Sequence, residues 1–289
     1  MNIDFLLCDG NRKLNTYIDA KKPKGFFRRC ILNSFLFLFC LCAVLPVQGQ
    51  LPEELECGIN SLLVTPSYVS GDPTSPLSLS KGNPAVVAFG YNSISTDAPQ
   101  ISDPPVAKLR LATAEDVGSV WGIAHQRTNN LVFTSTVLKR HAGYGPLGSG
   151  AIYVIEIDED LNGGGVRTDL SFRLEDLTLT NGGSIQTAPP GLANNVQRDL
   201  PPDGFIDASD ATTFPNIGRA SLGDIDITED EQTLWVVNVF DQTLYEIPID
   251  SPMVSPPTTA TAHPVPNPGC DGSGECRPWA VKVEDNMVY

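Results

Sequence analysis

Positive charge is scarce in this chain of 289 residues, which has 19 Lys and Arg side chains against 34 Asp and Glu. Residues 1–49 hold seven of the basic and three of the acidic side chains. The remaining 240 residues therefore carry 12 basic and 31 acidic groups, a formal charge of −19. Such a surface repels a nucleic-acid backbone. The composition thus excludes nucleic acid as a plausible partner.

Motifs for catalysis are also missing. The three histidines, His125, His141 and His263, lie far apart in the sequence. The chain has no G-x-S-x-G or H-E-x-x-H motif and no Cys/His spacing typical of a zinc site. Neither a serine hydrolase of that type nor a zinc enzyme is predicted.

Cysteine is concentrated at the N-terminus, where four of the seven lie within residues 1–42. Cys270 and Cys276, in the stretch GCDGSGEC, are close enough for a small-loop disulfide in an exported protein, with Asp-Gly and Ser-Gly to form the turn. Cys57 is left as the odd thiol.

The N-terminus has the order of a secretory signal. Residues 21–29 are basic, residues 31–47 are largely apolar, and small residues precede a cleavage point before Gln50. The alternative is an uncleaved anchor, but Pro46 and the polar residues after it end the run short of the about 20 apolar residues that span a bilayer. We expect residues 1–49 to be removed, leaving a secreted or cell-surface protein without a stable membrane span.

No segment has the helical periodicity that would predict a long helix. After residue 100 the chain alternates short β-branched and aromatic runs with turn residues, and Gly and Pro together number 49. Strands are predicted at 131–137, 151–157, 172–179, 233–240, 243–249 and 279–289. The Pro-rich segments 188–204 and 251–269 are predicted to be surface loops. The fold class is therefore all-β.

An internal repeat narrows the fold. Residues 121–133 align without a gap with residues 223–235, each as an apolar strand, a polar turn and a second strand. The strands that follow, 151–158 and 243–250, also match, and a third unit begins at Trp279. A meander of three or four strands cannot bury both faces alone, so its copies must stack, and radial stacking gives a propeller.

The second repeat unit, residues 222–250, resembles a blade of the YVTN/NHL type of β-propeller. The resemblance rests on Asp230, Thr233, Leu234, Val236, Val237 and Asn238. Trp235 replaces the usual Tyr, and Glu231 replaces the usual turn glycine. The resemblance implies an incomplete propeller of roughly three to four four-stranded blades with Pro/Gly-rich loop insertions.

A second resemblance concerns the setting. Residues 117–153 resemble a pattern in large exported bacterial propeller proteins, often followed by repeated immunoglobulin-like surface domains. We therefore expect an irregular segment at 50–104 with a first strand at 85–91, and a partial propeller at 105–289. Because residues 279–289 end in the middle of an expected strand, we expect the chain to be the front part of a longer protein.

Lys139, Arg140 and His141 form the densest cationic cluster of the mature chain. On a surface of charge −19 these residues are candidates to bind a carboxylate or a sulfated sugar. The alternative is that they pair with neighbouring acidic loops or pack against the next repeat.

A glycine series follows this cluster, Gly143-x-Gly145-x-x-Gly148, with Gly150 two residues further. The spacing imitates a dinucleotide fingerprint, but these glycines precede a strand and open no helix, so no nucleotide site is predicted. They are instead expected to allow positive φ angles in a loop between strands.

Residues 158–169 match the calcium-loop spacing D-x-D-x-N-G-x5-D, with Asp in the last position. The predicted calcium ligands are the side chains of Asp158, Asp160, Asn162 and Asp169 and the carbonyl of Gly164. The helices that flank such a loop in an EF-hand are absent, and an ordinary hairpin loop is the alternative. Asp203, Asp207 and Asp210 form a second acidic cluster with less regular spacing.

The sequence therefore favours an exported, non-catalytic module that binds an extracellular protein or glycan and is stabilised by calcium. The alternative is a metal-dependent propeller hydrolase of the lactonase type. Such an enzyme needs carboxylates from several blades around one channel, and Asp224 and Asp226 are the candidates for that role.

Overall fold

The computed structural model describes residues 6–7, 62–90, 108–158, 163–202, 212–270, 276–285 and 287–289. Most of the predicted signal segment, Cys57, two of the calcium-loop residues (Asp160 and Asn162) and the cluster of Asp203, Asp207 and Asp210 lie outside the described residues.

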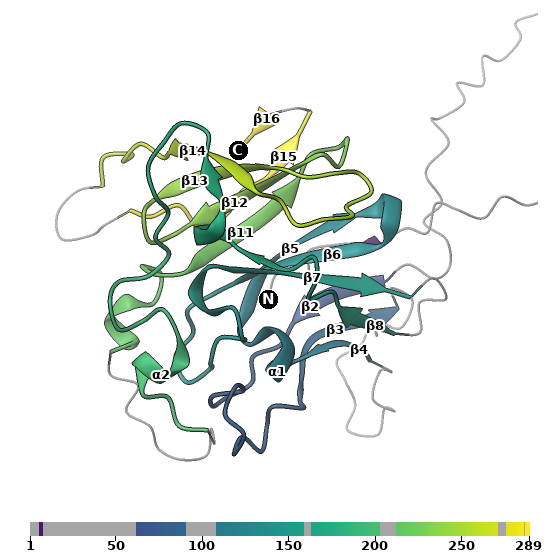
Figure 1. The fold of residues 1–289 in the computed structure, drawn as a ribbon, viewed down its shortest axis with the longest axis vertical. Coiled ribbons are helices and arrows are strands. Elements are labelled where there is room, and N and C mark those ends of the chain that lie inside the picture. Colours follow the sequence, from purple (N-terminus) through teal and green to yellow (C-terminus); the bar gives the residue numbers. More distant parts are fainter. Residues whose placement is uncertain are drawn as a thin grey trace, which may run out of the picture.

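The described chain forms three antiparallel sheets in sequence order, followed by a hairpin (Figure 1). The first sheet contains β1 (Leu6–Leu7), β2 (Leu62–Pro66), β3 (Pro84–Gly90) and β4 (Leu109–Thr113). The second contains β5 (Val120–Gln126), β6 (Leu131–Thr136), β7 (Ala151–Ile157), β8 (Gly164–Val166) and β9 (Phe172–Arg173). The third contains β11 (Leu222–Ile227), β12 (Thr233–Asn238), β13 (Thr243–Pro248) and β14 (Thr259–Pro264), with the short strand β10 (Thr178–Leu179) parallel to β14. The hairpin is β15 (Val283–Glu284) with β16 (Met287–Val288).

Helical structure in the described residues is confined to short segments. These are the four-residue helices α1 (Ala114–Val117) and α2 (Asn195–Arg198) and the 3₁₀ turns η2 (Arg127–Asn129), η3 (Gly148–Gly150), η4 (Leu174–Asp176) and η5 (Phe214–Asn216). None of the described helices has the length and apolar character needed to cross a membrane. The all-β prediction is confirmed.

The strand pairing confirms the internal repeat. In the second sheet Val120 pairs with Thr136 and Ile123 with Thr134, with a β-bulge between the two pairs. In the third sheet the equivalent pairs are Leu222 with Asn238 and Ile225 with Val236, again with a register shift between them. A bulge at the same place in both hairpins shows that the ungapped alignment of the two units is also their structural alignment.

The sheets pack face to face, so the second sheet is buried on both sides. One core lies between the first and second sheets and includes Val64, Val86, Val132 and Ile155. Another lies between the second and third sheets and includes Phe133, Val154, Leu234 and Ile247. In Figure 1 the order runs from the blue strands β2–β4 through the teal β5–β8 to the green and yellow β11–β14. Burial of both faces explains why the first half of β6 and most of β7 are apolar without alternation.

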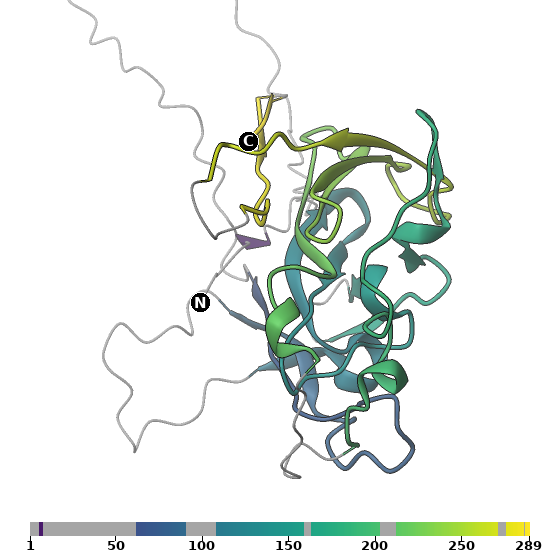
Figure 2. The same ribbon diagram turned by 90° about the vertical axis from the view of Figure 1, so that its left-hand side faces the viewer.

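The C-terminal hairpin covers the outer face of the third sheet. Val281 packs against Val237 and Val239, with Trp235 and Trp279 at the margin of this cluster. Figure 2 shows the hairpin in yellow beside the third sheet. A disulfide joins Cys270 and Cys276 in the segment before the hairpin, as the sequence predicts.

Three expectations about strands need correction. The segment 50–104, expected to be irregular with one strand, contributes both β2 and β3 to the first sheet. The strand predicted at 172–179 is divided by η4 into β9, which pairs with β7, and β10, which pairs with β14. The Pro-rich loop predicted at 251–269 contains β14, which pairs with β13 through the pattern TATAHP. For β14, cross-strand pairing stabilises a segment whose own sequence has little β signal.

Candidate functional site

The cationic residues lie on a tight turn after β6. The amide of Ala142 donates to the carbonyl of Lys139 at 3.4 Å, and His141 has φ of 64°. A positive φ at the third of four residues is the geometry of a type II turn, where glycine is usual and histidine costs free energy. The surrounding protein therefore holds this turn in a set conformation. We refer to residues 139–142 as the cationic turn.

A buried arginine beneath the cationic turn provides much of that support. Arg198, at the end of α2, is 3% exposed. Its guanidinium donates to the carbonyl of Lys139 at 2.9 Å and to that of Ala142 at 3.0 Å, and it stacks 5.0 Å from the Tyr144 ring centroid. From the other side, the amide of Gly71 donates to the carbonyl of His141 at 2.7 Å. The turn is thus joined to two segments that are distant in the sequence.

The two long cationic side chains of the turn point outward over exposed aromatic rings. The Lys139 ammonium lies 4.6 Å from the centroid of Tyr68, and the Arg140 guanidinium lies 5.4 Å from that of Phe214. Such contacts contribute about 0.5–1 kcal/mol at exposed sites. In the part of the chain that the structure describes, neither side chain forms an ion pair. Within the described residues these two cations therefore pack on aromatic rings and pair with no acidic loop.

The glycines after the cationic turn serve close packing more than positive φ, contrary to our expectation. Gly148 has φ of 78°, but Gly143, Gly145 and Gly150 do not have positive φ. A Cβ on Gly145 would lie 2.4 Å from the Tyr153 hydroxyl and 2.6 Å from the Val117 carbonyl carbon. The series lets the loop pass tightly over the end of the second sheet.

The predicted calcium loop is described only at its ends. Asp158 follows β7, and its amide donates to the carbonyl of Gly163 at 3.1 Å. Asp169 accepts two hydrogen bonds from Arg167, at 3.0 and 2.8 Å, and this lowers the pKa of its carboxyl group. Arg167 also pairs with Glu156 at 2.9 Å. Asp169 would have to leave Arg167 to bind calcium, and calcium binding stays a prediction.

Asp224 and Asp226 lie at the junction between the third sheet and the C-terminal hairpin. One oxygen of Asp226 accepts from Lys282 Nζ at 3.0 Å and from the Val283 amide at 2.8 Å, and the other accepts from the Ile227 amide at 2.9 Å. Asp224 accepts from the Ile225 amide at 3.0 Å. Within the described residues no group of three or more His, Cys, Asp or Glu side chains is placed to hold a metal ion.

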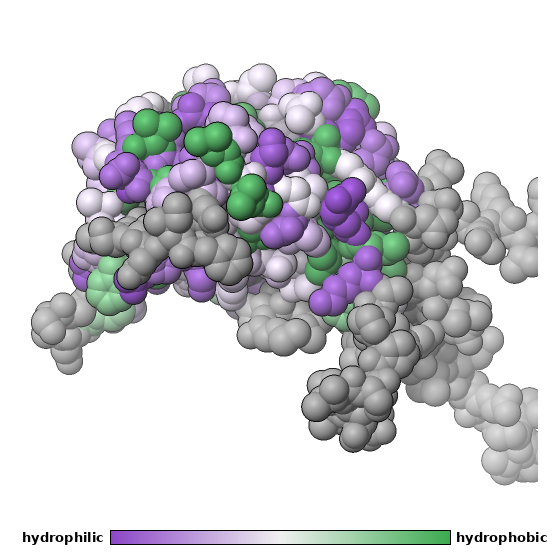
Figure 3. All heavy atoms as spheres, turned by 90° about the horizontal axis from the view of Figure 1, so that it is seen from below, coloured by the Kyte–Doolittle hydropathy of each residue, from purple (hydrophilic) through white to green (hydrophobic). Residues whose placement is uncertain are grey.

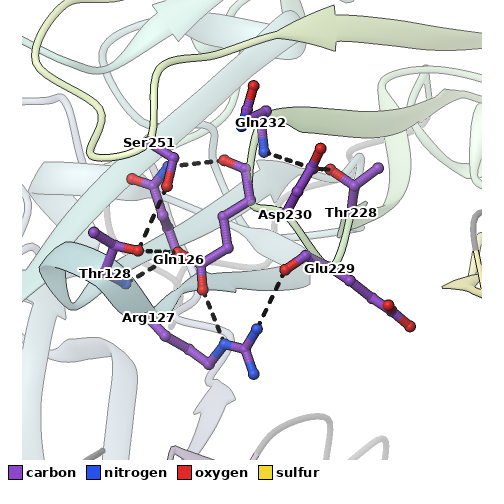
Figure 4. A network of polar contacts seen from close by, with 9 residues as sticks. Gln126, Arg127, Thr128, Thr228, Glu229, Asp230, Gln232 and Ser251 are labelled. Carbon is purple, nitrogen blue, oxygen red and sulfur yellow. Dashed lines mark hydrogen bonds and ion pairs between the residues drawn. The ribbon is translucent and has the colours of Figure 1, made fainter. Parts of the chain in front are cut away.

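Another junction joins the turns of neighbouring sheets, and Figure 4 shows Arg127 and Thr128 of one turn beside Glu229 and Asp230 of the other. Its main member is Glu231. Its carboxylate accepts from Arg127 Nε at 2.9 Å and from the amide and hydroxyl of Thr128 at 3.0 and 2.7 Å. The amide group of Gln126 donates to the carbonyls of Glu231 and Asp250, at 3.0 and 2.7 Å. Glu231 has φ of 60°, a left-handed conformation that glycine adopts without strain. Its role in joining the two turns was not predicted from the sequence.

His125 lies on β5 and is buried, and its Nε2 has no hydrogen-bond partner among the described residues. Burial lowers the pKa of His125 to about 4, although the nearby Glu231 carboxylate raises it in part. This histidine is neutral in the folded protein at ordinary pH. Its burial within a sheet supports a structural role.

The pH dependence of stability follows from that burial. In the unfolded chain the imidazole titrates near its ordinary value of about 6.5, so between about pH 6.5 and 4 the unfolded state binds more protons than the folded state. We expect the free energy of unfolding to fall by about 2 kcal/mol more between pH 7 and pH 5 in the wild type than in His125→Phe. Urea unfolding at both pH values measures this. Equal slopes for wild type and His125→Phe would contradict the prediction.

Comparisons with known proteins give distant relatives. No family model matches the chain. Colossin-D of Dictyostelium discoideum is 26% identical over 211 residues, which cover 69% of this chain and 20% of that protein. Colossin-C of the same organism is 28% identical over 252 residues, covering 83% of this chain and 22% of that protein. The chain thus spans about a fifth of the length of these curated relatives.

Among solved structures, a candidate 6-phosphogluconolactonase from Bacteroides fragilis matches 79% of this chain and 43% of its own. The identity is 9% and the TM-score is 0.39. A likeness of this strength carries no argument about fold or activity.

Proposed function

We propose that the chain is an exported binding module that uses the cationic turn to hold an anionic ligand outside the cell and performs no catalysis. The observation that carries the proposal is the state of Lys139 and Arg140. Both are held outward by a turn with buried support, and neither has an ion-pair partner in the described structure. On a chain that is strongly acidic overall, a fixed pair of unneutralised cations suits recognition of an anion.

The propeller architecture is part of the same proposal, with the sheets as blades of the YVTN/NHL type. Trp121, Gly223 and Trp279 occupy the same position in the three repeat units. The ring centroids of Trp121 and Trp279 lie 5.9 Å apart. Sheets packed face to face lie about 10 Å apart, so the first and third of three parallel layers would be about 20 Å apart. Contact between Trp121 of β5 and Trp279, which lies just before β15, therefore supports convergence of the repeat units toward an axis.

The lactonase-type alternative is less well supported. It requires carboxylates directed to a shared channel, whereas Asp226 is 3% exposed and accepts hydrogen bonds from Ile227, Lys282 and Val283. A carboxylate with those three donors is engaged in joining two units of the fold. The candidate residues thus favour a structural role over metal binding.

The test is binding of immobilised heparin and immobilised poly-L-glutamate, two anionic probes. We expect the wild type to bind at least one of them, and the double variant Lys139→Gln/Arg140→Gln to bind it at least about tenfold more weakly, since each charge-assisted hydrogen bond contributes about 1.5–3 kcal/mol. Arg167→Gln/Arg173→Gln, which removes the same charge from surface ion pairs, is the control. No binding of either probe, or equal weakening by both double variants, would contradict the proposal.

A further inference from the structure

A hollow of about 540 Å³ lies beside the cationic turn, between the loop joining β2 to β3 and the start of β4. Tyr68 belongs to both places, because it lines the hollow and its ring carries the Lys139 ammonium. Ser70 also lines the hollow and forms a β-bridge with Ala142 of the turn. The hollow and the cationic turn therefore form one continuous surface. Its volume lies in the range of about 300–1,000 Å³ that is usual for small-ligand sites.

The wall of the hollow combines polar and apolar groups, and its described part carries no negative charge. It contains the hydroxyls of Ser67, Ser70 and Ser80, the amide of Asn83 and the ammonium of Lys108, and none of its described lining residues is Asp or Glu. Ser80 donates to the carbonyl of Ser70 at 2.9 Å. The side chains of Asn83 and Lys108 have no polar partner in the described part of the chain. A hollow whose described lining has a cation and no carboxylate, on a strongly acidic protein, is suited to an anion.

A second hollow shows the contrast. It has a comparable volume, about 670 Å³, and is lined by Glu115, Asp116 and Lys81, the last of which pairs with Glu115 at 3.6 Å. In this second hollow Glu115 neutralises Lys81, and Asp116 adds a further negative charge. Binding of an anion there is therefore disfavoured. Charge therefore distinguishes the hollow beside the cationic turn from the other.

The remaining groups of the hollow indicate the class of anion. Tyr68 is 38% exposed, and burial of its hydroxyl raises its pKa to about 12, so it is a neutral donor beside an aromatic face. Leu79, in the same wall, is 85% exposed. The β2–β3 loop that carries these residues lies at the bottom of Figure 1, and Figure 3 shows hydrophobic and polar side chains mixed on that lower face. Hydroxyls, an amide and an aromatic ring together match a sugar ring, which has many hydroxyls on its edge and C–H groups on its face.

We propose that this hollow and the cationic turn form one binding site for an acidic oligosaccharide. The sugar ring packs on Tyr68 and its hydroxyls pair with Asn83 and the serines, while its carboxylate or sulfate groups bind Lys108 and Lys139. This inference rests on the proposed function and adds to it both a ligand class and a second part of the site.

The test is calorimetry with four soluble probes: a heparin hexasaccharide, a hexagalacturonate, neutral maltohexaose and hexaglutamate. Lys108→Gln and Asn83→Ala change the hollow and leave the cationic turn intact, and Arg167→Gln is the matched charge control. We expect at least one acidic sugar to bind and maltohexaose not to bind. Lys108→Gln should weaken sugar binding about tenfold and Asn83→Ala about fivefold, with Arg167→Gln unchanged. Both altered side chains are exposed, so thermal unfolding should be unchanged in each variant.

The other outcomes separate this inference from the proposed function. Binding of hexaglutamate but of neither acidic sugar, lost in Lys139→Gln/Arg140→Gln, would overturn the oligosaccharide site and leave the proposed function standing. Sugar binding that depends on Lys139 but not on Lys108 or Asn83 would overturn the part played by the hollow. Binding of none of the acidic probes would overturn both.

Discussion

Replacing Glu231 with alanine is expected to lower the free energy of unfolding by about 2–3 kcal/mol, because the change removes a buried carboxylate that accepts three hydrogen bonds. The Thr128 amide and hydroxyl and the Arg127 guanidinium all donate to this carboxylate, which joins the turn of the second sheet to that of the third. Urea or thermal unfolding measures the effect. A loss of less than about 1 kcal/mol would contradict this role for Glu231.

Two further substitutions at Glu231 distinguish the contribution of the carboxylate to stability from the cost of the positive φ angle. Glu231 has φ of 60°, which glycine adopts without strain. Glu231→Gly should therefore be more stable than Glu231→Ala by about 1 kcal/mol, although both lack the carboxylate. Glu231→Gln keeps the shape and should lose less than either. Gln232→Ala, at an exposed position of the same turn, should change stability by less than about 0.5 kcal/mol.

The same junction makes stability sensitive to acid. Burial raises the pKa of Glu231, but the hydrogen bonds from Thr128 and Arg127 outweigh burial and hold it below the ordinary value of 4.5. A carboxyl group with a lowered folded-state pKa stabilises the protein fully above its unfolded value, and that contribution is lost as the pH falls through the folded value. The stability difference between wild type and Glu231→Gln should be constant above about pH 5.5 and shrink below about pH 4.5.

Gly122→Ala is expected to have a comparable effect, about 3 kcal/mol or more, for a steric reason. A Cβ at this position would lie 2.7 Å from the Ile225 amide nitrogen and 2.9 Å from the Asp224 Cα, both backbone atoms of β11 in the next sheet. Backbone cannot rotate away as a side chain can, so the substitution must push β5 and β11 apart. Equilibrium unfolding and the yield of folded protein both report the loss.

The matched control is Gly165→Ala in β8. A Cβ there would meet no atom within 4 Å, and its φ is not positive. Stability should stay the same or rise slightly, since alanine reduces the entropy of the unfolded chain. If Gly122→Ala were as stable as Gly165→Ala, the close approach of the two first strands would not be a feature of the folded protein.

The all-β class and the internal repeat could be predicted because both depend on the order of apolar, β-branched and turn residues within short segments. The runs at 131–136 and 151–157 are rich in β-branched and aromatic residues, and they form β6 and β7. β14 could not be predicted in this way. Its Thr and Ala side chains carry little hydrophobic signal, and it is a strand because β13 and β10 pair with its two edges.

The candidate site could be predicted only in part, because its support comes from distant residues. The cations at 139–141 are conspicuous in an acidic chain, so they could be predicted as a binding site from the sequence. Arg198 was hidden in a Pro-rich segment, and its bonds to the turn are made to carbonyls, which leave no trace in a sequence pattern. For Glu231 the sequence offered one indication, an acidic residue at a turn position where the resemblance to the YVTN/NHL pattern leads one to expect glycine.

The attachment of the cationic turn has a consequence for how specificity can change in evolution. Arg198 and Gly71 bind the turn through the carbonyls of Lys139, His141 and Ala142, groups that every amino acid supplies. The side chains at 139 and 140 can therefore be exchanged without removing these bonds to the turn. Related chains could carry different side chains on a turn of the same backbone conformation and recognise different ligands. Replacement of Arg198 would remove two of the hydrogen bonds that hold this turn.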